Sequence, residues 1–352
     1  MWTFGYKYWK DLRLKKRGNL AYNQGYFCGG GQTSSNAPVA TVNKLTYSTK
    51  TMSVNSYNLG SARLGSAGAS SDSLDVGYIA GGLGTFQALG YTDKITYSND
   101  TIASSTAITA RWCLAAISNG TTGWFAGGVL QNGFQTNLIE KITLSSGSVS
   151  TSSLTLQYSR GSLVSLSNSS TGYFIDGYTY IPTDQSGVYL SYTDKMNMSN
   201  ETWTSQTAAS LLPANRILPA TASWKGNKGY FYGGKDTGGN VYNSLYAIAY
   251  SNDAATTITT TGIDNVGWAC GLSDNPGGYG YFSGGSTANA SEGTATQKTY
   301  LLTYSSQVLS AQTTANLATG AYFMGSVSGN ESTDPTAEPV YGGRMLRFGY
   351  GF

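Results

Sequence analysis

Histidine is absent from this chain of 352 residues, and Asp, Glu, Lys and Arg together make up only 11% of it. Histidine is the commonest metal ligand and the usual general acid or base near neutral pH. Its absence excludes catalytic triads that need His and zinc or copper sites built on imidazole. The 18 acidic residues leave a carboxylate-pair hydrolase as a remote alternative. We therefore expect no enzyme, no cofactor and no bound metal.

Cysteine is also scarce. Only Cys28, Cys113 and Cys270 are present, and no two of them are spaced as a CxxC pair. An odd count without that spacing argues against a zinc knuckle and against a disulfide framework. Each cysteine falls in a segment that we predict to be a strand. We therefore expect three buried free thiols that pack as small apolar side chains.

Long apolar runs are missing as well. No stretch of 18 apolar residues occurs, so we expect no membrane-spanning helix. The chain begins MWTFGYKYWKDLRLKKR, with its aromatic part before its basic part. A secretory signal has the opposite order, a basic start followed by an apolar core. We therefore expect no secretory signal in this segment.

The most informative feature that is present is an aromatic–glycine phrase that returns about every 50 residues. Clear copies such as GYFCGG stand at 25–30, 77–82, 123–128, 229–234 and 280–285, and degraded copies stand at 172–177 and 339–344. Repeats of this length are typical of β-propellers, in which each repeat folds into one blade. Seven copies predict an all-β, seven-bladed propeller that forms a single domain over residues 19–352.

The third repeat predicts the content of one blade. WCLAAIS at 112–118 is a short apolar run that favours a buried innermost strand, and GWFAGG at 123–128 is a second strand. LIEKITLS at 138–145 alternates apolar and polar residues and predicts a third strand. The Ser/Thr-rich segment from 146 onward predicts a thin outer strand. Each blade should therefore contain four strands.

The last repeat looks incomplete, which predicts how the ring closes. Residues 320–329, 339–344 and 345–352 supply three strands, and the sequence WTFGYKYW at 2–9 alternates as a strand does. Pairing the two ends of the chain would remove the exposed edges of an open array. We therefore predict that the N- and C-terminal strands close the ring, with residues 2–9 as the outer strand of the seventh blade.

The strand that ends on two glycines resembles the kelch repeat, over about 320 residues. The tyrosine that follows the glycines in kelch blades is matched at Tyr47, Tyr97, Tyr250 and Tyr304, whereas the kelch tryptophan is matched only at Trp203. The phrase, the sequence DKITYSND at 93–100 and an arginine that opens the next strand are together similar to kelch-like propellers of tailed-phage and cyanophage structural proteins.

This resemblance implies a non-enzymatic virion component in a tail, neck, fibre or capsid-surface position. It implies synthesis in the host cytoplasm, other virion structural proteins as partners in a multi-copy assembly, and contact with a host-surface protein or glycan. The virion is the location that follows from it.

A Tyr-rich loop at 177–192 supports an alternative function. It carries four tyrosines, Tyr178, Tyr180, Tyr189 and Tyr192. Tyrosines on loops give contact area at low entropic cost and suit the recognition of sugars or proteins. The alternative is a lectin-like, extracellular adhesion propeller that binds a glycan. Because 27 tyrosines are spread along the chain, a chance cluster is the competing interpretation.

Arginine recurs where the innermost strand begins, at Arg63, Arg111, Arg160 and Arg216. The four could form a cationic ring that binds an acidic partner. The interpretation that we favour is structural, with each guanidinium bonded to carbonyls or to a carboxylate of the adjacent blade, because arginine presents a fixed fork of donors.

Positive charge is concentrated in residues 1–18, which hold six basic residues against Asp11 alone: Lys7, Lys10, Arg13, Lys15, Lys16 and Arg17. A basic segment can bind nucleic acid or an acidic protein surface. Here the aromatic residues between the charges alternate as in a strand. We therefore predict a docking arm that also closes the ring, and no nucleic-acid partner.

Overall fold

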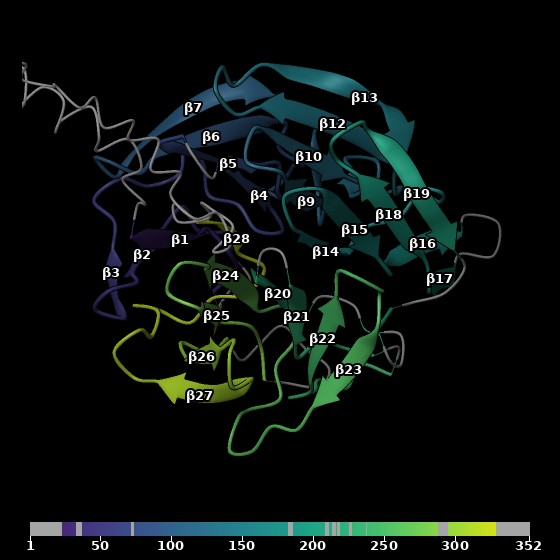
Figure 1. The fold of residues 1–352 in the computed structure, drawn as a ribbon. Coiled ribbons are helices and arrows are strands. Elements are labelled where there is room, and N and C mark those ends of the chain that lie inside the picture. The colour runs from purple at the N-terminus through teal and green to yellow at the C-terminus, as the bar shows by residue number, and fades with distance from the viewer. Residues whose placement is uncertain are drawn as a thin grey trace, which may run out of the picture.

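The computed structural model describes residues 23–32, 37–71, 74–181, 186–207, 211–212, 216, 219–224, 227–236, 238–287 and 295–328. Every regular element in these residues is a strand, and six four-stranded antiparallel sheets form the blades of a β-propeller. Figure 1 shows the blades following one another around a ring, with their innermost strands at the centre.

From the centre outward, blade 1 contains β28 (Gly325–Ser328), β1 (Gln24–Cys28), β2 (Val42–Thr46) and β3 (Thr51–Val54). Blade 2 contains β4 (Ala67–Ser70), β5 (Val76–Ala80), β6 (Tyr91–Thr96) and β7 (Thr101–Ala107). Blade 3 contains β9 (Ala115–Ser118), β10 (Thr122–Ala126), β12 (Leu138–Thr143) and β13 (Val149–Thr155).

Blade 4 contains β14 (Val164–Ser167), β15 (Thr171–Ile175), β18 (Thr193–Asn197) and β19 (Thr202–Thr207). Blade 5 contains β20 (Ala220–Trp224), β21 (Lys228–Tyr232), β22 (Leu245–Ala249) and β23 (Ala255–Ile258). Blade 6 contains β24 (Cys270–Asp274), β25 (Tyr279–Ser283), β26 (Thr299–Thr303) and β27 (Val308–Gln312). The predicted four-stranded blade, with the aromatic–glycine phrase on its second strand, is confirmed.

The prediction of seven blades is wrong for the described residues, which form six. Residues 325–328, which we assigned to the first strand of a seventh blade, form β28 and pair with β1 from Gly25↔Ser328 to Cys28↔Gly325. Strand β28 also lies between the innermost strands β24 and β4 of the flanking blades. The ring is therefore complete with six innermost strands. The predicted strands at 2–9, 339–344 and 345–352 lie outside the described residues.

Glycine and small residues fill the innermost strands because these strands approach one another closely. A Cβ atom on Gly68 would lie 1.8 Å from the carbonyl oxygen of Ser326, and one on Gly271 would lie 1.9 Å from that of Thr221. No side chain fits at such distances. The innermost strands are therefore crowded around the channel.

The aromatic residue of the repeated phrase packs against the following blade. Four such contacts are tyrosine pairs with ring centroids 5.3–5.9 Å apart: Tyr26–Tyr97, Tyr173–Tyr250, Tyr230–Tyr304 and Tyr281–Tyr47. The last pair joins blade 6 to blade 1. At the two remaining junctions the partners are Tyr78 with Leu144, and Trp124 with Met198. The same contact thus runs around the whole ring.

The first glycine of the phrase makes room for this packing. A Cβ on Gly25 would lie 2.3 Å from the hydroxyl oxygen of Tyr47, and one on Gly77 would lie 2.2 Å from that of Tyr97. The glycine therefore belongs to the scaffold.

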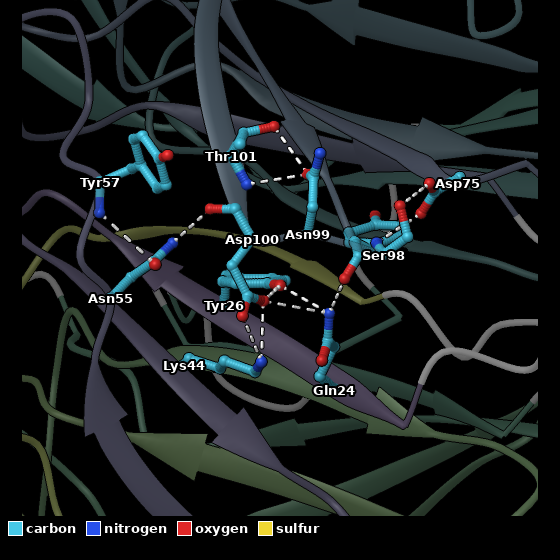
Figure 2. A network of polar contacts seen from close by, with 11 residues as sticks. Gln24, Tyr26, Lys44, Asn55, Tyr57, Asp75, Ser98, Asn99, Asp100 and Thr101 are labelled. Atoms are coloured by element: carbon cyan, nitrogen blue, oxygen red, sulfur yellow. Dashed lines mark hydrogen bonds and ion pairs between the residues drawn. The ribbon is translucent and has the colours of Figure 1, made fainter.

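Toward the outside, a lysine of one blade reaches an acidic turn residue of the next. Lys44 Nζ lies 2.7 Å from both carboxylate oxygens of Asp100, and the Tyr26 hydroxyl donates to the same carboxylate at 2.5 Å. Figure 2 shows Lys44, Tyr26 and Gln24 converging on Asp100. Equivalent ion pairs join Lys141 to Glu201 and Lys195 to Asp253 at 2.8 Å. Asp100, Glu201 and Asp253 each stand at a positive φ in the turn between the third and fourth strands of their blades.

Candidate functional site

Three of the predicted arginines are fully buried and bind a carboxylate on the third strand of the blade that they open. Arg63 donates to Asp93 at 2.6 Å and to the carbonyl oxygens of Gly81 and Tyr91 at 3.2 and 3.3 Å. Asp93 also accepts the N–H of Gly60, shortly before the arginine, at 3.3 Å. The carboxylate therefore fixes both the guanidinium and the backbone that leads to it.

The same clamp recurs in the next two blades. Arg111 pairs with Glu140, and Arg160 pairs with Asp194. Burial lowers the pKa of Arg111, and the negative charge and hydrogen bond of Glu140 oppose that shift. All three guanidinium side chains are inaccessible to solvent. These arginines therefore act as structural clamps and offer no charge to a surface ligand.

Our structural interpretation of the arginines needs one correction. The carboxylate partner belongs to the same blade as the arginine rather than to the adjacent one, because the third strand of a blade lies beside the segment that opens it. Contact with the preceding blade is made by the backbone instead. The N–H of Gly30 donates to the Arg63 carbonyl at 2.8 Å, and that of Gly82 donates to the Arg111 carbonyl at 2.9 Å.

Arg216, in blade 5, differs from the other three. The position that holds a carboxylate in blades 2–4 is occupied by Tyr246. The guanidinium lies over the ring of Tyr242, 3.1 Å from its centroid, and its Nε and Nη1 atoms have no hydrogen-bond partner in the part of the chain that the structure describes. Burial lowers the pKa of Arg216. This buried cation is stabilised by an aromatic face, without an ion pair among the described residues.

The loops between the second and third strands gather on one face of the ring, which we call the loop face. In blade 2, Leu83 forms antiparallel β-bridges with Leu64 and with Ala88. In blade 3, β11 (Val129–Leu130) pairs with β8 (Arg111–Trp112), and Val129 also bridges Gln135. Each loop is thus a short hairpin that pairs back onto the segment opening its own blade. The arginine clamps fix those segments.

In blade 4 this loop becomes a longer hairpin, formed by β16 (Tyr178–Ile181) and β17 (Ser186–Tyr189). The hairpin is anchored to the ring because Tyr178 and Gly161 exchange backbone hydrogen bonds of 2.8 and 2.9 Å. The ring of Tyr178 covers Gly187, where a Cβ would lie 1.7 Å from the tyrosine oxygen. Only glycine permits this position of the tyrosine.

Two glutamines of the blade 3 loop tie the three loops together. The N–H of Ala88, in the blade 2 loop, donates to Gln131 Oε1 at 2.5 Å. The N–H of Tyr180, in the blade 4 hairpin, donates to Gln135 Oε1 at 2.9 Å. The loops of blades 2, 3 and 4 therefore form one connected surface.

A groove of about 420 Å³ lies between these loops, and we call it the blade 2–4 groove. Its lining is aliphatic in the blade 2 and blade 3 loops, aromatic at Trp112, Tyr178 and Tyr180, and polar at the two glutamines and Ser162. None of the described residues that line it carries a charged side chain. Two phenylalanines of the same loops are exposed, Phe86 in the blade 2 loop by 91% and Phe134 in the blade 3 loop by 43%. The volume lies within the range of about 300–1,000 Å³ of ligand pockets.

Of the four tyrosines proposed from the sequence as binding residues, only two line the groove. Tyr178 and Tyr180 line the groove. Tyr189 packs edge-on against Tyr178, with centroids 5.4 Å apart, and supports it from behind. Tyr192 packs against Tyr158 at 4.4 Å and does not line the groove.

The central channel is narrow, and the polar groups that line it hydrogen-bond largely to one another. One end holds about 170 Å³ and the other about 100 Å³. Each of the six innermost strands contributes a serine to the lining of the narrow end: Ser70, Ser118, Ser167, Ser223, Ser273 and Ser328. These serines bond to one another around the ring, for example from Ser118 Oγ to the Ser70 carbonyl. We therefore regard the channel as scaffold.

The cysteines are free and buried, as predicted. Burial raises the pKa of Cys270 to about 11. Cys113 lies between β8 and β9 at a φ of 52° rather than within a strand. No group of three or more His, Cys, Asp or Glu side chains within the described ranges could hold a metal ion. The part of the chain that the structure describes contains no helix long and apolar enough to cross a membrane.

No family model and no curated protein matches this sequence. The function must therefore be inferred from the geometry. Sequence reasoning found the arginines and the Tyr-rich loop, but it missed the carboxylates that pair with the arginines and the two loop glutamines. The sequence did contain a signal for these carboxylates. The dipeptide Asp-Lys or Glu-Lys stands at 93–94, 140–141 and 194–195, in three of the four repeats that an arginine opens. The six basic residues of the predicted arm lie outside the described residues.

Proposed function

We propose that the protein is a non-enzymatic structural protein of a virion, in a tail, neck, fibre or capsid-surface position, and that its rigid ring presents the loop face to another surface. The observation that supports this most strongly is the connection of three neighbouring loops over one exposed groove. A preformed contact surface costs little conformational entropy on binding. The virion assignment rests on the resemblance of the repeats to phage propellers.

Three buried carboxylates support a non-catalytic role. Asp93, Glu140 and Asp194 are each bound by an arginine inside a blade. A general acid or base must instead lie within reach of a substrate proton. Each of these groups is committed to an ion pair inside its own blade.

The segment 1–18 is proposed to dock the ring onto a partner virion protein. Strand β28 already closes the described ring with β1, so the basic and aromatic residues at the start of the chain are not needed for that purpose. Six basic residues would attract an acidic protein surface. Other virion proteins are thus the proposed partners, with a host-surface protein or glycan at the loop face.

The test is whether the protein travels with particles. Virions purified on a density gradient should contain it in constant ratio to the capsid protein, as measured by quantitative mass spectrometry. Replacing the six basic residues of segment 1–18 by Gln should remove it from the particles. Replacing Lys94 and Lys298, on the ring itself, should not. A wild-type protein that stays in the soluble fraction would refute the virion role.

The groove supports a second candidate function, a lectin-like adhesion module that acts outside the cell. Aromatic and amide side chains in an uncharged groove suit sugar rings, which have apolar faces and many hydroxyl groups. A glycan array should then give binding that Tyr180→Ala abolishes and Tyr192→Ala leaves intact. Absence of binding to every glycan would exclude this function and leave the virion role untouched.

A further inference from the structure

The blade 2–4 groove contains two amide groups whose orientation is fixed by the fold. A backbone N–H can only donate, so the atom that accepts it on Gln131 or Gln135 is the side-chain oxygen. Ala88 and Tyr180 supply these N–H groups. Both amide nitrogens consequently remain available, and neither has a partner among the described residues. The groove therefore holds two oriented hydrogen-bond donors.

The aliphatic part of the lining is close to these donors in the chain and in space. Leu83 and Ala88 come from the blade 2 loop, and Val129 and Leu130 come from the blade 3 hairpin that also carries Gln131. Burying a small apolar group such as a methyl on such a surface is favourable because it removes apolar area from water. The groove thus joins methyl-sized apolar contacts to amide donors.

The third feature of the lining is aromatic. Trp112, Tyr178 and Tyr180 line the groove. Indole and phenol rings supply large, rigid contact area at low entropic cost. Because the described lining residues carry no charged side chain, a charged ligand would lose hydration there without gaining a counter-charge from them. The occupant should therefore be neutral, with an apolar face, a carbonyl acceptor and a methyl group.

We propose that the blade 2–4 groove binds a neutral sugar that carries an acetamido group. The acetamido carbonyl accepts from a glutamine amide, its methyl group packs on the aliphatic residues, and the sugar ring lies against an aromatic side chain. This proposal rests on the lectin-like function above and names its ligand class.

The experiment is isothermal titration of the intact protein with two trisaccharides. Tri-N-acetylchitotriose and cellotriose share a β-1,4-linked backbone and differ in the acetamido groups. The acetylated trisaccharide should bind about 10-fold or more tightly, as expected for one added, well-paired hydrogen bond and a buried methyl group. Equal affinities would overturn the acetamido proposal and leave glycan binding standing. Absence of binding to both would also overturn it, and the glycan array then decides whether any glycan binds.

Variants that keep the loops tied separate recognition from folding. Gln131→Glu and Gln135→Glu retain an oxygen for the N–H groups of Ala88 and Tyr180 but remove the amide donors. Each should weaken binding of tri-N-acetylchitotriose about 10-fold without lowering the melting temperature. Gln312→Glu, on β27 of blade 6, is the matched control and should bind as the wild type does. Full affinity in both groove variants would contradict the proposal.

Discussion

The two halves of the ring are held together by different chemistry. In blades 2, 3 and 4 a buried arginine pairs with a carboxylate. In blades 6 and 1 the arginine position is occupied by Val266 and Ala321, and the carboxylate position is occupied by Tyr300 and Asn43. Tyrosine pairs show the reverse distribution: they are missing at the junctions 2–3 and 3–4 and present at the other four. A blade of this fold therefore does not require the ion pair.

The three blades that contain the ion pair are also the blades whose loops form the groove on the loop face. The connected, uncharged groove lies over the three blades that carry the clamps. A buried ion pair is weak evidence for added stability, because desolvation costs about as much as the pairing returns. Its effect here is positional, since Asp93 and its equivalents hold the segments onto which the loops pair. We infer that the clamps fix the groove, while aromatic packing suffices elsewhere.

The largest expected effect comes from one substitution made at two arginine positions. Arg160→Met leaves Asp194 buried without its cation and should lower the free energy of unfolding by about 3–5 kcal/mol. Arg216→Met removes a cation that has no carboxylate and should change it by about 1 kcal/mol or less. Denaturant titration followed by tryptophan fluorescence measures both. Equal losses would mean that the clamp is irrelevant to the difference between the halves.

A double variant sharpens this result. Asn43 of blade 1 accepts the N–H of Ala318 at 3.4 Å, just as Asp194 accepts that of Gln157. Arg160→Met combined with Asp194→Asn should therefore imitate blade 1 and recover about half of the stability lost by Arg160→Met alone. A double variant that is less stable than the single one would show that the ion pair cannot be replaced in blade 4.

The stability of the half of the ring that relies on tyrosine packing, blades 5, 6 and 1, should be the more sensitive to alkali. Burial raises the pKa of Tyr230 to about 12, whereas an unfolded tyrosine ionises near pH 10. The folded protein keeps the neutral form at pH values where the unfolded chain loses its proton, so stability is full below pH 10 and falls as pH rises through 12. Tyr230→Phe should reduce this loss by about 1 kcal/mol at pH 11.

At pH 7 the same variant should match or slightly exceed the wild type, because the buried Tyr230 hydroxyl has no hydrogen-bond partner among the described residues. Thermal melts at pH 7 and pH 11 test both statements. Identical alkaline sensitivity in the wild type and the variant would show that Tyr230 ionises normally in the fold.

The smallest expected effect concerns the outer lysines. Lys195 pairs with Asp253 across the junction of blades 4 and 5, both side chains being partly exposed. Lys195→Met should cost about 0.5–1 kcal/mol, less at high salt. Lys94→Met should cost almost nothing, because the turn position of the next blade that holds Asp253 opposite Lys195 is occupied by the uncharged Gly147 opposite Lys94. Thermal melts at low and high ionic strength compare the two.

Much of the scaffold could be predicted because it repeats. The phrase at 25–30 and its copies located the second strand of each blade, and residues such as Tyr97 and Tyr250 marked the following turns. The blade count was wrong because adjacent residues need not share a blade: Gly325–Ser328 follow blade 6 in the chain but pair with β1. That pairing is a long-range contact with no local signal.

The groove was harder to predict because it arises between repeats. Gln131 and Gln135 stand in an ordinary polar loop, and their meaning comes from the backbone groups of Ala88 and Tyr180 that reach them. Tyr178 and Tyr192 look alike in the sequence, yet only the first lines the groove. Spatial neighbours from different blades decide such differences.

The most direct test of the account measures amide hydrogen exchange by NMR at Ala88 and Tyr180. The account predicts that both amides exchange about 100-fold or more slowly than in an unstructured chain. Gln131→Ala should release only Ala88, and Gln135→Ala should release only Tyr180. Exchange of both amides at unstructured rates in the wild type would contradict the claim that the three loops form a preformed groove.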